Sequence, residues 1–180
     1  MTTPAQVSFR DLDAMESSRL LTRNHVGRIA YSFRDRVDIE PISYIYADGR
    51  IYIRTAPGSK LTALSHAPWV AFEVDEVTGP HDWRSVVVHG TVYVLEDRGS
   101  KVARESYRLA VSHLRTLMPH ALGVGDPTPE RTVVMQLHPD TMTGREARPV
   151  ITDREAPASR SRKASPDDAI PGDTRRPAPR

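Results

Sequence analysis

Apolar residues in this chain recur at every second position in short runs between Arg28 and Leu137. The clearest run alternates Ile29, Tyr31 and Phe33 with smaller or more polar neighbours, which is the pattern of a half-buried strand. Further strands are predicted at about residues 37–46, 51–54, 70–74, 85–95 and 133–137. Six short strands with mostly antiparallel connections close most simply into a small barrel. The sequence therefore predicts a mainly β fold, a six-stranded antiparallel split β-barrel with helices packed outside it.

Two turn signals shape the second and third of these runs. Asp48-Gly49, between Tyr46 and Ile51, is typical of a two-residue β-hairpin. After Pro41 the apolar phase slips by one residue. A slip at a proline indicates either a β-bulge or a strand edge, where the missing N–H costs little.

Three segments have helical spacing instead. Ser8 followed by Asp11 is typical of a helix start and predicts a first helix over about residues 9–22. A short helix is expected over Ser59–His66, and apolar residues at helical spacing predict another over residues 100–118.

The aromatic residues indicate where the folded part ends. All eleven lie between Phe9 and Tyr107, whereas residues 146–180 hold six of the fifteen prolines and few apolar residues. Such a segment buries too little apolar surface to offset the entropy of ordering it. We therefore expect a single domain over residues 1–145 and a disordered, Pro- and Arg-rich tail over residues 146–180.

The charge distribution follows the same division. Residues 1–145 carry 17 basic and 17 acidic side chains, and residues 146–180 carry 8 basic and 6 acidic ones. The net charge of +2 thus comes from the tail, and the domain has no excess of positive charge for specific nucleic-acid binding. The N-terminus has no basic segment followed by an apolar run, and no apolar stretch reaches about 20 residues, so we expect a cytoplasmic protein without membrane contact.

Several kinds of chemistry are disfavoured by the residues available. The chain has no cysteine, which excludes disulfides, thiolate metal sites and thiol nucleophiles. The histidines form no pair at metal-ligand spacing, so a site built from His66, His81 and His89 is weakly supported and no metal is expected. Ser85 has no histidine and carboxylate partners at a recognisable spacing, which disfavours a hydrolase triad.

Two segments could hold a ligand. The third strand leads through Gly58 into a helix that begins Ser59-Lys60, and such a helix start offers N–H groups and positive charge to an anion. An ordinary helix cap beside a solvated lysine explains the same residues. At the start of the fifth strand, Trp83-Arg84 could face a ligand, although core or rim packing also accounts for them.

Taken in order, the motifs of the chain resemble the pyridoxamine-phosphate-oxidase-like family of flavin-binding split barrels. The resemblance covers residues 8–145 and is nearest to the branch with the nitroimidazole-resistance proteins. It is carried by Val26-Gly27-Arg28-Ile29-Ala30, Pro41 through Tyr46, Asp48-Gly49-Arg50-Ile51-Tyr52, Gly58-Ser59-Lys60-Leu61, Ala67 through Val74, and Trp83 through Gly90.

The resemblance implies a homodimer with two flavin mononucleotide (FMN) molecules between the barrels. The residues that match the family's phosphate contacts are Arg54, Thr55, Ser59 and Lys60. The strand backbone that would line the isoalloxazine ring runs through Ile42, Ser43 and Tyr44. The residues that would complete the pocket are Trp83, Arg84, Ser85 and Val86.

The resemblance also implies an FMN-dependent oxidoreductase that acts on a small-molecule substrate. A deazaflavin (F420) could replace FMN, and a non-catalytic protein that stores flavin or haem is the main alternative. An interaction protein that works through its tail is a third. Where nitroimidazole-resistance proteins place a histidine, this chain has Arg54, and it has no tryptophan after Trp83. Reduction of nitro drugs and oxidation of pyridoxamine phosphate are therefore not carried over.

Overall fold

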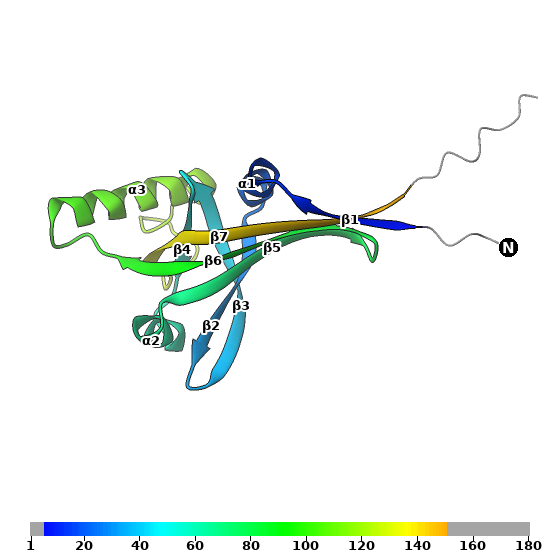
Figure 1. Cartoon of the computed structure of the whole chain (residues 1–180). Coiled ribbons are helices and arrows are strands. Elements are labelled where there is room, and N and C mark those ends of the chain that lie inside the picture. Colours follow the sequence, from blue (N-terminus) through cyan, green and yellow to red (C-terminus); the bar gives the residue numbers. More distant parts are fainter. Residues whose placement is uncertain (1–5, 151–180) are drawn as a thin grey trace, which may run out of the picture.

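The computed structural model describes residues 6–150. Figure 1 shows their path from the N-terminal strand to the end of the last strand. In chain order the elements are β1 (Val7–Leu12), α1 (Ala14–Arg23), β2 (Val26–Phe33), β3 (Arg36–Ala47), β4 (Arg50–Thr55), α2 (Ser59–His66), β5 (Trp69–Gly79), β6 (Asp82–Leu95), α3 (Lys101–Leu117) and β7 (Val133–Pro149).

Six of the strands pair in a closed ring. The sheet runs β7-β4-β3-β2-β5-β6, and β6 pairs again with β7, so the last strand closes on the first. Every one of these pairings is antiparallel. Closure leaves fewer exposed edges than an open sheet of this length would carry. The predicted six-stranded antiparallel barrel is confirmed, and the hairpin at Asp48-Gly49 is present with positive φ at both residues.

The prediction for the N-terminus was wrong in part. Residues 7–12 form β1, which pairs with the distal half of β7, and the helix begins only after Asp13. The Asp13 side chain accepts a hydrogen bond from the Glu16 N–H, and Glu16 accepts one from the Asp13 N–H. This reciprocal capping box starts α1 five residues later than Ser8 suggested.

The phase slip at Pro41 has a different cause from a bulge. The pairing of β2 with β3 runs without interruption from Val26 opposite Ser43 to the hairpin turn. Val37 and Ile39 point outward and are exposed, whereas Ile42 lies on the inward face. The apolar residues therefore change face along a regular strand, and of the two alternatives a strand edge is the one present.

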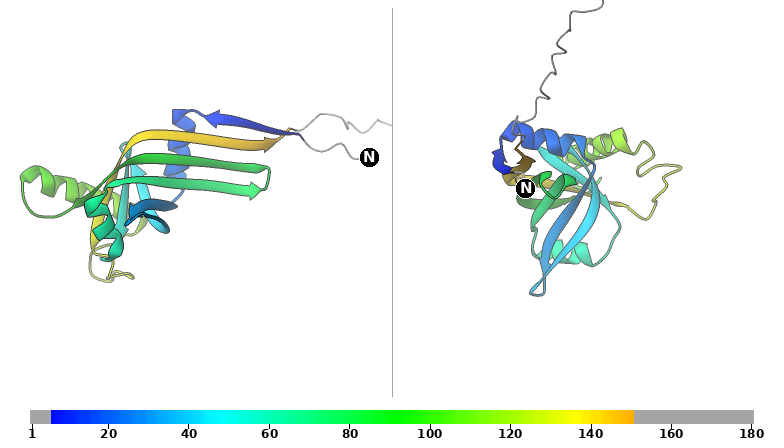
Figure 2. Two further views of the ribbon diagram at one scale, coloured as in Figure 1. Left: turned by 60° about the horizontal axis from the view of Figure 1, so that its bottom comes forward. Right: turned by 90° about the vertical axis from the view of Figure 1, so that its right-hand side faces the viewer.

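Four strands carry the sheet beyond the barrel. The distal halves of β5, β6 and β7, with β1 alongside, form a twisted ribbon that projects to one side (Figure 2). We call this the distal ribbon. Strand β7 continues to Pro149, so residues 146–149, which were expected in the tail, belong to the sheet. The rest of the expected tail, residues 151–180, lies outside the described residues.

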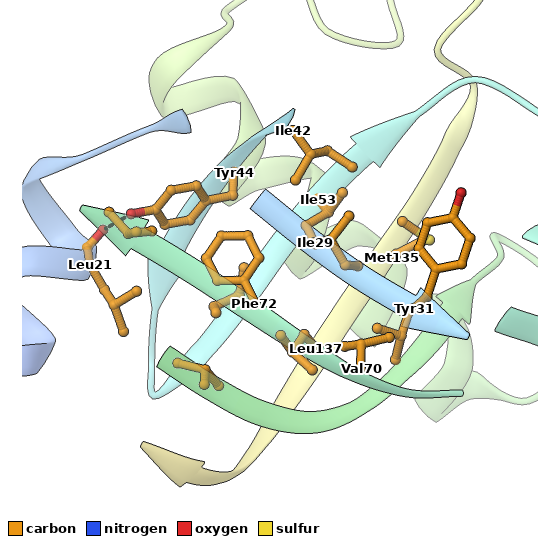
Figure 3. Close-up of a cluster of buried hydrophobic side chains, with 14 of the residues drawn as sticks. Leu21, Ile29, Tyr31, Ile42, Tyr44, Ile53, Val70, Phe72, Met135 and Leu137 are labelled. Atoms are coloured by element: carbon orange, nitrogen blue, oxygen red, sulfur yellow. Dashed lines mark hydrogen bonds between the residues drawn. The ribbon is translucent and has the colours of Figure 1, made fainter. Parts of the chain in front are cut away.

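The barrel interior is filled by large side chains from every strand of the ring (Figure 3). Tyr44 meets Phe72 edge-on, with ring centroids 4.9 Å apart, and its hydroxyl donates to the Leu21 carbonyl at 2.8 Å. This hydrogen bond ties α1 to the barrel. A Cβ at Gly27 would lie 2.3 Å from the Phe72 ring, so only glycine fits there. Burial of each large apolar side chain in this core stabilises the folded state by about 1.5–3 kcal/mol.

A second cluster lies on the outer face of the sheet, under α3. It consists of Ile45, Tyr52 and Val134 from the strands, with Ala110, Val111 and Leu114 from the helix. This cluster fixes the outward face of β4, which matters for the position of Arg54 described below.

Candidate functional site

The start of α2 is open to a ligand. Its N-cap residue, Gly58, has no side chain to bond the first-turn N–H groups, and Ser59 is exposed. These N–H groups and the positive end of the helix dipole favour an anion at this position. Thr55, at the end of β4, is buried beside this turn. Lys60 follows Ser59 in the first turn of the helix. The structure thus brings together Thr55, Ser59 and Lys60, three of the predicted phosphate contacts.

Lys60 belongs to a short polar chain. Its ammonium donates to Glu40 on β3 at 2.5 Å, and the Tyr31 hydroxyl donates to the other oxygen of the same carboxylate at 2.5 Å. Both hydrogen bonds lower the pKa of Glu40, and the one from Lys60 has the larger effect. The Lys60 side chain is 11% exposed. An ammonium has three N–H donors, so two remain beyond Glu40. We refer to Thr55, Ser59, Lys60 and Glu40 as the α2 corner.

Glu40 was missed by the sequence prediction, although the sequence held a signal for it. Glu40 is two residues before Ile42 and four before Tyr44, and these two define the inward face of β3. An acidic residue with the parity of core residues is expected to have a buried partner, because an unpaired buried charge is costly. Its partner, Lys60, comes 20 residues later in a predicted helix, but the sequence did not show that this helix lies against β3.

Arg54 does not reach the α2 corner. Neighbouring side chains alternate along β4, so Arg54 lies on the outward face with Tyr52, opposite to Thr55. Its guanidinium forms a fork with the Asp126 carboxylate and also donates to the carbonyls of Thr128 and Arg131. Arg54 is 2% exposed. In this structure it anchors the loop between α3 and β7.

The backbone of β3 has an open edge next to the α2 corner. Pairing of β3 with β4 begins at Tyr44 opposite Ile53, whereas pairing with β2 continues to the hairpin turn. The Tyr44 N–H bonds the His25 carbonyl on the β2 side. By alternation, the Ser43 N–H and the Pro41 carbonyl point to the other side, beyond the first pair with β4. An edge of this kind suits proline, whose missing N–H faces no partner strand.

The side chains of the three predicted β3 residues are not equivalent. Ile42 and Tyr44 are buried in the barrel core, and the Tyr44 hydroxyl is already bonded. Only Ser43 is turned outward and partly accessible. The prediction concerned the backbone of this segment, and the open edge is consistent with that role.

The predicted residues of β6 separate onto two faces of the distal ribbon. Val86 is buried in the core, and Arg84 shares its face and pairs with Glu146. Trp83 and Ser85 point the other way, as period-two alternation requires. On that face Trp83 lies beside Phe9, with ring centroids 6.3 Å apart. We call it the Trp83 face.

Hollows line the Trp83 face. A cavity of about 420 Å³ is bordered by Phe9, Trp83 and Arg145, among others, and a second of about 470 Å³ includes Ser85 and Met142. Phe9 is 69% exposed. A hollowed face on which exposed apolar side chains lie among charged ones is typical of a surface that another molecule covers.

The α2 corner and the Trp83 face are far apart within one chain. Both are registered against β7, where Thr55 lies opposite Val133 and Trp83 lies opposite Ala147. At about 3.3 Å per residue, this separation along the strand is up to about 45 Å. The two groups of residues therefore lie towards opposite ends of β7.

Within residues 6–150, no helix is long and apolar enough to span a bilayer. The same residues contain no cluster of three or more histidine or acidic side chains that could hold a metal ion.

Comparison with known proteins identifies relatives of this chain. The family model described as pyridoxamine 5'-phosphate oxidase matches residues 13–146. An uncharacterized protein of Rhizobium meliloti (strain 1021) is 28% identical over 81 residues, which are 45% of this chain and 54% of that protein. The chain thus matches only about half the length of this curated relative.

Two solved structures have the same fold. An FAD-binding protein from Mesorhizobium loti is 28% identical, with 77% of this chain and 97% of that chain covered and a TM-score of 0.63. A candidate 5-nitroimidazole antibiotic resistance protein from Bacteroides thetaiotaomicron is 17% identical, with 79% and 89% covered and a TM-score of 0.61. At 17% identity, the second likeness shows the fold alone.

Proposed function

The chain belongs to the pyridoxamine 5'-phosphate oxidase family, and we propose that it is a flavoprotein that binds FMN and uses it to oxidise or reduce a small organic molecule. The FAD-binding relative from Mesorhizobium loti supports a flavin. An isoalloxazine ring supplies the redox chemistry, since it accepts and returns hydride or electrons, and the protein supplies binding and orientation.

One observation carries this proposal: an anion-binding helix start lies beside an open strand edge. The α2 corner offers N–H groups, a hydroxyl and one ammonium to a phosphate. The β3 edge at Pro41 and Ser43 offers backbone groups to a flat polar ring. FMN carries a doubly negative phosphate and a planar ring joined by a short chain, and this pair of features suits both ends of it.

The residues present fit the cofactor with one change from the family pattern. Ser59, Lys60 and Thr55 hold the phosphate in our proposal, and the backbone at Ser43 contacts the ring. Arg54 is assigned a structural role, because its donors are engaged by Asp126 and by two carbonyls.

We propose that Trp83 and Ser85 reach the same flavin from a second copy of the chain. Their separation from the α2 corner along β7 supports a site that is shared between two chains. The exposed apolar residues of the Trp83 face, together with its hollows, supply a surface on which the partner's barrel could rest. A twofold dimer would then hold two equivalent flavins, each between one copy's α2 corner and the other's ribbon.

The first experiment is the visible absorption spectrum of the purified chain, followed by titration with FMN and with FAD. Bands of oxidised flavin, or tight binding of added FMN, are expected, with FAD bound more weakly because the corner has groups for one phosphate. Bleaching of the bound flavin by a nicotinamide nucleotide would favour an enzyme over a flavin store. A colourless protein that ignores both flavins would contradict the proposal, and a Soret band would identify a haem protein instead.

A further inference from the structure

A compact arginine cluster lies on the other face of the distal ribbon, between the ribbon and α1. Five arginines and one glutamate line a cavity of about 160 Å³, and two leucines complete the wall. The residues are Arg10, Leu12, Glu16, Arg19, Leu20, Arg23, Arg84 and Arg148. We call this the arginine pocket. It faces away from the Trp83 face, because Arg10, Arg84 and Arg148 have the opposite parity on their strands.

One buried carboxylate organises the pocket. Glu146 is 4% exposed, and three arginine Nε atoms surround it, at 2.8 Å from Arg10, 2.5 Å from Arg84 and 2.9 Å from Arg148. These residues come from β1, β6 and β7, so Glu146 holds guanidinium groups from three neighbouring strands in fixed positions.

The tips of these guanidinium groups stay available. Arg84 bonds Glu146 through Nε, and the closest approach of Arg148 is also through Nε. Within residues 6–150, their terminal NH₂ groups make no hydrogen bond. Arg19, on the exposed side of α1, has neither a hydrogen bond nor an ion pair among the described residues. A guanidinium carries five N–H donors in a planar fork that matches the oxygens of a phosphate or carboxylate.

The charges of the pocket do not balance. Five guanidinium groups face three carboxylates, those of Glu16, Glu146 and Glu76, the last of which pairs with Arg23. Among the arginines that line the pocket and the carboxylates that pair with them, two positive charges are in excess. The hydrogen bonds from Arg10 lower the pKa of the Glu16 carboxyl to about 2, so Glu16 is ionised near neutral pH and is one of the three negative charges. A doubly negative group would neutralise the excess.

The pocket has room for such a group and a way out for whatever carries it. A water molecule takes about 30 Å³ in the liquid, so 160 Å³ accommodates a group of several heavy atoms. Arg84 and Arg148 also line a neighbouring hollow of about 500 Å³, whose other residues on the same face are Glu76, Thr78 and Asp82. The anionic head of a small organic molecule could therefore sit in the arginine pocket, with its body in the larger hollow.

We propose that the arginine pocket binds a phosphate group, either free or carried by a small organic molecule, at a site separate from the flavin. Arg19, Arg84 and Arg148 would donate to its oxygens, and Glu146 would keep two of them in place. This site is formed by one chain and does not depend on the proposed flavin site.

The test is a calorimetric titration of the full chain with inorganic phosphate and with phenyl phosphate, with chloride at equal ionic strength as the blank. Binding of phosphate to the unmodified chain is expected, and Arg19→Gln should weaken it by about tenfold or more, the loss expected for a charge-assisted contact. Arg148→Gln should act in the same direction. Both side chains are on the surface, so the fold is expected to survive. Arg36→Gln, an exposed arginine on β3, is the matched control and should leave binding unchanged.

The α2 corner could also take phosphate, and the variants separate the two sites. Lys60→Ala should leave the phosphate binding described here unchanged, and Arg19→Gln should leave FMN binding unchanged. Tighter binding of phenyl phosphate than of inorganic phosphate would indicate an organic phosphate as the ligand, whereas equal binding would indicate the free ion. No binding above the chloride blank, or equal binding by the unmodified chain and Arg19→Gln, would overturn the proposal.

Discussion

Two ion pairs lie on opposite sides of β4, and they differ in how completely their donors are used. In the Arg54–Asp126 pair the side chains are 2% and 4% exposed, and the guanidinium also bonds two carbonyls. In the Lys60–Glu40 pair they are 11% and 41% exposed, and the ammonium keeps donors in reserve. The saturated pair holds the fold together, whereas the unsaturated one can still bind a ligand. In the sequence, Arg54 and Lys60 are both cations close to the predicted phosphate site, so residue type alone does not show which of them binds the ligand.

The largest effect should come from breaking the saturated pair. Arg54→Ala removes the charged partner of the buried Asp126 carboxylate and leaves it only the donors of Leu122 and Thr128, which should lower the free energy of unfolding by about 3–5 kcal/mol. Urea denaturation measures this, with Arg36→Ala as a surface control expected to change little. A small loss of stability with a large loss of FMN affinity would return Arg54 to the phosphate and remove the contrast between the two pairs.

Breaking the other pair should affect ligand binding more than stability. Lys60→Ala removes a charge-assisted contact to the phosphate, so FMN should bind less tightly, by roughly 1.5–3 kcal/mol in binding free energy. Fluorescence titration of FMN checks this, with the exposed Lys101→Ala as the matched control. Unchanged FMN affinity in Lys60→Ala would place the phosphate elsewhere.

A smaller effect tests the strand edge. Ser43→Pro removes a backbone N–H that points away from β2, so FMN binding should weaken by about 0.5–1.5 kcal/mol while the barrel still folds. Ser43→Ala keeps the N–H and should bind FMN like the unmodified chain. If both variants bound FMN equally well, the ring would not contact this edge.

The pH dependence sharpens the comparison on the stability side. Arg54, with the N–H groups of Thr128 and Leu122, lowers the pKa of Asp126 to about 2. In the unfolded chain an aspartate has a pKa of about 3.9. The folded value is the lower one, so the contribution of Asp126 is complete above about pH 4 and is lost as the pH falls towards 2. Unfolding measured at pH 7, 5 and 3 should show this loss only at pH 3, and Asp126→Asn should remove that component. A loss already present at pH 5 would disagree.

The sequence predicted the barrel because its signals are local. Alternation marks the strands, Asp48-Gly49 marks a hairpin, and the bounds of α2 came out as Ser59–His66. The start of α1 was missed because Ser8 resembles a cap as much as Asp13 does, and only the pairing of β1 with β7 shows that residues 7–12 are extended.

The site was predicted less completely, because its decisive partners are distant in sequence. Arg54 and Asp126 are 72 residues apart, and Arg10 and Glu146 are 136 apart. No periodicity links such residues, and strand parity showed only which face each occupies. Parity would have separated Trp83 from Arg84 and Arg54 from Thr55, and it would have pointed to Glu40.

The central claim is that one flavin site takes Lys60 from one chain and Trp83 from another. It is tested by mixing two variants, Lys60→Ala and Trp83→Ala, each expected to bind FMN weakly as a homodimer. After subunit exchange, half of the dimers are mixed and each mixed dimer has one intact site, so roughly a quarter of all sites should regain tight FMN binding. If mixing restores no tight binding although subunits exchange, the site lies within a single chain and the account is wrong.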